Sequence, residues 1–234
     1  MMSAYQVLLS LHGLLGLVAL ATFWVAGMSK KGSPLHKRAG KVYLAAMVGL
    51  LVPALPLAVR VLTLKSTFGG IFLLYLWVIT ITSVWVSWRA IRDKRDWARF
   101  TGPVYRGLAV LNLASGAVVL ALGLFFASQS QLIFIAFSLV GLLGGVGMLR
   151  FTRRAPTQPR WWLEEHLGAM IGNGVATHIA FLSIGLPKLL PMLAGPLLQN
   201  LAWLAPLAAA VLARIYLGRK FLPAPAALPA AKLA

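Results

Sequence analysis

Apolar runs of about 20 residues alternate with short polar segments along almost the whole chain. A helix needs roughly 20 apolar residues to cross the hydrocarbon core of a bilayer. We therefore predict seven transmembrane helices, at Tyr5–Met28, Val42–Leu64, Phe68–Trp88, Gly107–Ala127, Gln131–Leu149, Leu167–Leu186 and Asn200–Leu217. The predicted fold class is all-α, a polytopic transmembrane bundle of about seven helices.

Two segments break this pattern. Residues 187–199 contain Pro187, Pro191 and Pro196, which disfavour a continuous helix, so we expect an external or interfacial connection there. After residue 220 the sequence is rich in Pro and Ala, which is typical of a loosely packed tail. We predict one transmembrane domain, residues 1–220, followed by a cytoplasmic tail, residues 221–234.

The basic residues define the predicted orientation. Only Arg60, Lys65 and Lys188 belong to one side of the predicted bundle. The other side carries Lys30, Lys31, Lys37, Arg38, Lys41, Arg89, Arg92, Lys94, Arg95, Arg99, Arg106, Arg150, Arg153, Arg154, Arg160, Arg214, Arg219, Lys220 and Lys232. Because cytoplasmic connections are enriched in Lys and Arg, we predict an N-terminus outside and a C-terminus in the cytoplasm.

Composition agrees with a membrane protein. Of the 234 residues, 60% are hydrophobic and 11% are charged, whereas soluble domains carry about a quarter charged residues. The net charge of +18 lies in blocks between apolar runs, which favours anionic lipid as a partner and argues against nucleic acid. We expect a multi-pass protein of the bacterial cytoplasmic (inner) membrane. The chain has no cysteine, so iron–sulfur clusters and cysteine-ligated zinc are excluded.

The four histidines are the candidate ligands. His12 and His178 each lie about eight residues from the predicted outer surface, roughly 12 Å deep, and form an outer pair. His36 and His166 both lie near the cytoplasmic face and form an inner pair. Intramembrane ionisable side chains are rare and point to function. Two histidine pairs suit haem b or a histidine-ligated transition metal, with a redox or electron-transfer role and a quinone or other redox partner.

The sixth predicted helix adds polar residues to this site. His166, Met170, Asn173 and Thr177 follow a 4-3-4 spacing and form one stripe, in which we include Met170 and Asn173 as cofactor-binding candidates. Glu164 or Glu165 is a candidate acceptor that orients a ligating imidazole. No predicted span contains Asp or Glu, which lowers the expectation of an ion-coupled transporter.

Two alternatives stay open. The stripe on the sixth helix also suits a carrier of small molecules or lipids. Buried histidines also serve as interhelical hydrogen-bond donors, which suits a structural subunit of a membrane complex. The sequence does not decide whether the chain is an enzyme.

Three stretches carry a family resemblance: LLSLHGLLGLVAL, KKGSPLHKRAGKVYLAAM and WWLEEHLGAMIGNGVATHIAF. They resemble a family of uncharacterised bacterial membrane proteins, described as a domain of unknown function. That family has a histidine in its first helix, a KGxxLHxRxGxVY loop and a WxxEHxxxM helix. The resemblance implies that His12, His36 and His166 belong to one functional set, with Glu165 beside them, and it implies no reaction.

Overall fold

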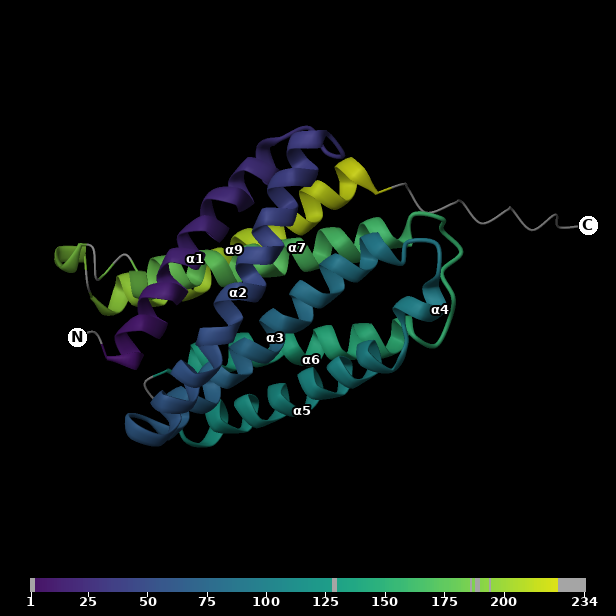
Figure 1. Ribbon diagram of the computed structural model, residues 1–234. Helices are drawn as coiled ribbons and strands as arrows, with labels where there is room; N and C mark the ends of the chain where they lie inside the picture. The colour runs from purple at the N-terminus through teal and green to yellow at the C-terminus, as the bar shows by residue number, and fades with distance from the viewer. Residues whose placement is uncertain (1–2, 128–129, 186, 188–189, 194, 223–234) are drawn as a thin grey trace, which may run out of the picture.

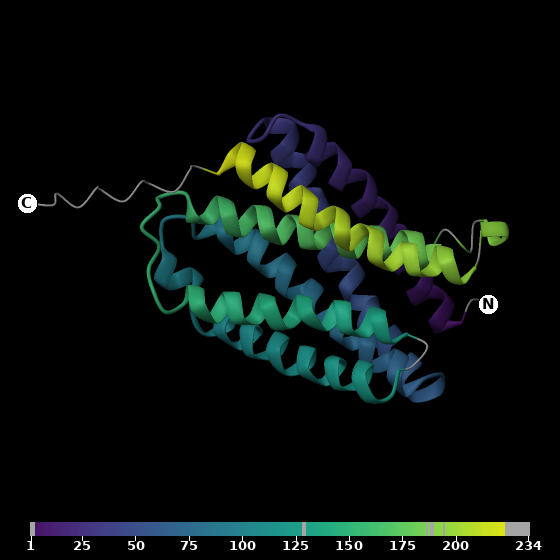
Figure 2. The same ribbon diagram turned by 180° about the vertical axis from the view of Figure 1, so that it is seen from behind.

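The computed structural model describes residues 3–127, 130–185, 187, 190–193 and 195–222, and every regular element among them is helical (Figures 1 and 2). The α-helices are α1 Ala4–Met28, α2 Pro34–Leu64, α3 Thr67–Arg92, α4 Trp97–Phe100, α5 Pro103–Phe125, α6 Gln131–Phe151, α7 Trp161–Ile179 and α9 Pro196–Phe221. A π-helical turn, η1, covers Ala180–Gly185, and a 3₁₀ turn, η2, covers Pro191–Leu193. The predicted all-α class is confirmed.

Six helices are long and apolar enough to cross a membrane: α1, α2, α3, α5, α6 and α9. The multi-pass architecture is thereby supported. The helix α7, which corresponds to the predicted sixth span, is not among the six. It has 19 residues, and its first turns hold Glu164, Glu165 and His166. Because α7 packs against α3, α9 and α1, much of its surface meets protein rather than the outside of the bundle.

Two helices, α2 and α7, begin six or more residues earlier than the hydrophobic pattern predicts. The α2 helix starts at Pro34, where the Ser33 hydroxyl accepts a hydrogen bond from the backbone N–H of His36 (3.2 Å). Ser at the N-cap followed by proline is a strong helix start. The hydrophobic pattern, with a predicted span that begins at Val42, leaves His36 in the connection before it. This is corrected, because His36 sits in the first turn of α2. The α7 helix likewise starts at Trp161, six residues before the predicted span.

Successive connections lie at opposite ends of the bundle (Figure 1). The α1–α2 turn, α4, the α6–α7 connection and the end of α9 lie at one end, which we call the basic end. It carries the basic blocks at Lys30–Lys31, Arg92–Arg95, Arg150–Arg154 and Arg219–Lys220. The N-terminus and the α2–α3 and α5–α6 connections lie at the other end.

The helices α3 and α7 pack side by side at the centre, and α9 lies along α7 (Figure 2). The close α5–α6 pair depends on two glycines of α6. A Cβ on Gly141 would lie 3.0 Å from the Asn112 carbonyl oxygen, and one on Gly145 would lie 2.8 Å from that of Ala109. This is the small-residue packing expected for membrane helices. By contrast, a Cβ on Gly13 or Gly16 of α1 would meet no atom within 4 Å, so helix packing does not require glycine at either position.

Part of the proline-rich segment 187–199 and nearly all of the tail, residues 223–234, lie outside the described residues. Among the described residues of that segment, Pro191–Leu193 form η2 and Pro196 begins α9.

Candidate functional site

The polar stripe of α7 faces the interior of the bundle, as its spacing predicts. Asn173 is fully buried and donates from Nδ2 to the Ser87 hydroxyl of α3 (3.2 Å). The Thr177 hydroxyl donates to the Asn173 carbonyl (2.9 Å) and lies 3.1 Å from the Tyr43 hydroxyl of α2. Met170 packs against the cluster around Tyr43. Asn173 and Met170, both predicted to bind a cofactor, thus contact protein groups from α2 and α3.

One buried acceptor in this stripe has no partner. The Asn173 Oδ1 atom is buried without a hydrogen bond, in the part of the chain that the structure describes. Unpaired buried polar atoms are uncommon because the lost hydration is not replaced.

His36 and His166 both lie at the basic end, His36 in the first turn of α2 and His166 near the start of α7. The His166 ring occupies the second turn of α7, before the apolar stretch that begins at Leu167. Burial lowers the pKa of His166, its hydrogen bond to Ser87 opposes this, and the charge of His36 lowers the pKa further. The inner pair of the prediction is therefore brought into one region of the fold.

Hydrogen bonds fix the tautomer of both rings. Nδ1 of His36 lies 2.9 Å from the Ala26 carbonyl oxygen of α1, and Nδ1 of His166 lies 2.9 Å from the Ser87 carbonyl oxygen of α3. A carbonyl oxygen only accepts, so Nδ1 carries the proton in each case. In the neutral ring Nε2 then holds the lone pair that binds a metal. No hydrogen bond from a described residue reaches either Nε2 atom.

The outer pair is not brought together. Nδ1 of His12 lies 3.1 Å from the Leu50 carbonyl oxygen of α2, whereas His178 meets Trp24 of α1. Trp24 lies twelve residues beyond His12 on α1, or about 18 Å along the helix axis. The shared site of His12 and His178 is therefore corrected. His12 and His178 were predicted to lie the same number of residues from the outer ends of their helices. This does not place the two rings side by side, because α1 crosses α7 obliquely (Figure 1).

His178 has both ring nitrogens engaged. Its Nδ1 donates to the Gly174 carbonyl oxygen (2.7 Å), and its Nε2 accepts from the Trp24 indole N–H (3.1 Å). Phe23 packs edge-on against the ring, and a Cβ on Gly174 would overlap the Phe23 ring. Because Gly174 has no side chain, the Phe23 ring of α1 packs closely against α7 at this position. His178 consequently has no lone pair left for a metal, and its predicted role as a ligand is corrected.

The carboxylates of α7 do not orient the histidine. Glu164 pairs with Arg214 of α9 (2.8 Å), and the Tyr105 hydroxyl of α5 donates weakly to Glu165 (3.5 Å). The Ser87 carbonyl takes the orienting position that the prediction gave to Glu164 or Glu165. Burial raises the pKa of Glu165 to about 7; the charge of Glu164 adds to this rise, while Arg214 and the Tyr105 bond oppose it.

The set of four histidines forms no many-ligand metal site. Among the described residues, no group of three or more His, Cys, Asp or Glu side chains is placed to hold a metal ion. Structural and catalytic zinc sites use at least three protein ligands. A haem would need only a pair of imidazoles from the protein, so it is the candidate cofactor that two histidines would be able to hold.

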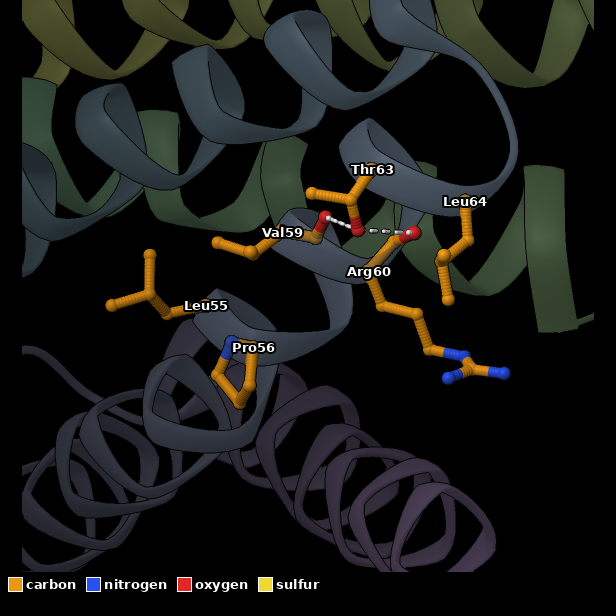
Figure 3. Close-up of a pocket in the computed structure, with 6 residues that line it drawn as sticks. All are labelled: Leu55, Pro56, Val59, Arg60, Thr63 and Leu64. Carbon is orange, nitrogen blue, oxygen red and sulfur yellow. Dashed lines mark hydrogen bonds between the residues drawn. The ribbon is translucent and has the colours of Figure 1, made fainter.

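An open groove runs along the last turns of α2 (Figure 3), and this part of α2 lies at the end opposite the basic end (Figure 1). It measures about 470 Å³ and is lined by Leu55, Pro56, Val59, Arg60, Thr63 and Leu64. The Arg60 guanidinium lies 4.8 Å from the centre of the Tyr5 ring. No histidine lines this groove, so it is separate from the inner pair.

Sequence reasoning missed the residues that position the histidines. Ser87, Ala26 and Leu50 act through backbone carbonyls, which carry no sequence signal. Arg214 was detectable, because an arginine inside an apolar helix is rare and usually paired. Comparisons with known protein families, with curated proteins and with solved structures found no match.

Proposed function

We propose that the chain is a multi-pass protein of the bacterial cytoplasmic membrane that binds haem b between His36 and His166. Its N-terminus lies outside and its C-terminus lies in the cytoplasm, so the site is at the cytoplasmic face. The bound haem supplies one-electron redox chemistry, and a quinone or a soluble carrier is the exchange partner.

The orientation rests on charge. The basic blocks gather at one end of the bundle, and Lys and Arg are retained on the cytoplasmic side of membranes. Of the basic residues in the described ranges, Arg60 and Lys65 lie at the opposite end, in and just after the last turns of α2.

The observation that supports haem binding is the hydrogen bonding of the His36 and His166 imidazoles. His36 and His166 come from different helices, each donates Nδ1–H to a backbone carbonyl at 2.9 Å, and each keeps Nε2 available. Hydrogen bonding of one ring nitrogen is how proteins set the orientation and basicity of a ligating imidazole. Lys31 and Lys220 belong to the basic blocks at the same end of the bundle and suit the propionates.

The test is the absorption spectrum of the purified full-length chain, produced with an ample supply of haem. We expect a Soret band with one haem per chain. His36→Gln and His166→Gln are expected to lose it, because glutamine retains an N–H donor but does not replace imidazole on iron. His12→Gln and His178→Gln are matched controls and are expected to keep it. No Soret band in the unchanged protein, or equal loss in all four variants, contradicts the proposal.

A structural role is the second candidate, and one observation favours it. His12, His36 and His166 each link two helices through a backbone carbonyl, which stabilises a bundle without any cofactor. On this account His166→Leu lowers stability while His166→Gln largely preserves it, and no variant changes an absorption spectrum. Stability and spectrum measured on the same variants separate the two candidates.

A further inference from the structure

A small basic hollow lies between α3 and α4 at the basic end. It measures about 390 Å³ and is lined by Arg92, Asp93, Lys94, Arg95, Asp96 and Arg99. Four of these six side chains are cations, so the hollow is suited to an anion.

Both carboxylates of the hollow are used to hold the loop. The Asp93 side chain is only 1% exposed and pairs with Arg89 and, at 3.6 Å, with Arg99. The Asp96 carboxylate accepts a hydrogen bond from the Arg99 backbone N–H (2.8 Å). No ion pair within the described ranges engages Arg92, Lys94 or Arg95. Contacts within the loop therefore hold its conformation, and the three cationic side chains remain available to bind an external anion.

Tryptophans place the hollow at the membrane surface. The Arg92 guanidinium lies 5.0 Å from the Trp88 ring centre, and the Lys94 ammonium lies 5.9 Å from that of Trp162. Trp88 is 46% exposed, which suits the interfacial position that tryptophan prefers in membranes. Lipid phosphates lie at this level.

We propose that this loop binds the headgroup phosphate of an anionic phospholipid in the adjacent leaflet. Arginine matches phosphate oxygens with paired N–H donors, and lysine adds a point charge. Lipid binding at this loop does not require haem, so its test is independent of the test of the proposed function.

The experiment titrates the full-length chain in detergent with phosphatidylglycerol or phosphatidylcholine and counts bound lipid by native mass spectrometry. Arg92→Gln combined with Lys94→Gln is expected to weaken phosphatidylglycerol binding about 25-fold, from about fivefold for each basic residue. The control combines Arg219→Gln with Lys220→Gln, which removes the same charges at the end of α9, and is expected to change binding less than about twofold.

A third variant distinguishes a specific phosphate-binding site from general electrostatic attraction between the basic chain and anionic lipid. Asp93→Asn makes the chain more positive but releases Arg89 and Arg99, so we expect binding to weaken severalfold. Tighter binding by this variant, equal binding of phosphatidylcholine, or equal losses in the two double variants overturns the proposal. Displacement of bound phosphatidylglycerol by equimolar inorganic phosphate also overturns it, because the site would then serve a free anion.

Discussion

The sharpest test of the packing compares one substitution at two adjacent positions of α6. A Cβ on Gly145 would lie 2.7 Å from Leu113 Cγ and 2.8 Å from the Ala109 carbonyl oxygen of α5. A Cβ on Gly144 would meet no atom within 4 Å. A backbone carbonyl in a helix moves little, so α5 and α6 must separate to accept Gly145→Ala.

The magnitude follows from two opposing terms. Alanine is intrinsically better than glycine in a helix by about 1 kcal/mol, and this gain applies equally to both positions. Overpacking costs about 1–3 kcal/mol and applies at Gly145 alone. We therefore expect Gly144→Ala to be neutral or stabilising, and Gly145→Ala to be about 1–3 kcal/mol less stable than Gly144→Ala.

The assay is equilibrium unfolding in mixed micelles, followed by far-ultraviolet circular dichroism. Because helix propensity cancels in the comparison, the difference between the two variants reports the α5–α6 contact. Equal stability of the two variants, or greater stability of Gly145→Ala, would refute the close packing described for this pair.

Three further outcomes are expected. Tyr43→Phe removes the buried bond to Thr177 and should lower the free energy of unfolding in micelles by about 0.6 kcal/mol, the average for such bonds in membrane proteins. Trp24→Phe frees His178 Nε2 and should raise the rate at which that ring reacts with diethyl pyrocarbonate, measured by mass spectrometry. The pKa of Glu165 is raised to about 7 in the fold, so its ionisation lowers stability as pH rises from about 4.5 through 7; Glu165→Gln should remove that part of the pH dependence in thermal unfolding.

Hydrophobic patterning predicted the helices well because length and apolarity decide which segments enter a bilayer. The start of α2 was missed because the cluster of Lys and Arg after His36 resembles a connection. Ser33 and Pro34 carried the correct signal, an N-cap followed by proline. The start of α7 was missed because its polar first turns are stabilised by contacts with α3 and α5, which a local pattern does not contain.

The candidate site was predictable only in part. Counting residues from a helix end gives depth, but a shared site also needs the right face and the right tilt. His36 and His166 share the basic end, whereas His12 faces α2 and His178 faces Trp24. The anchoring carbonyls, such as that of Ser87, depend on helix packing and on no particular side chain.

The most direct test of the central claim is a thiol cross-link between the two inner histidine positions. The chain has no cysteine, so an introduced pair is the only source of thiols. We expect His36→Cys combined with His166→Cys to be joined efficiently by a short bismaleimide in native membranes, while His12→Cys combined with His178→Cys is not. Cross-linking of the second pair, or its absence in the first pair with both thiols reactive, would contradict the site.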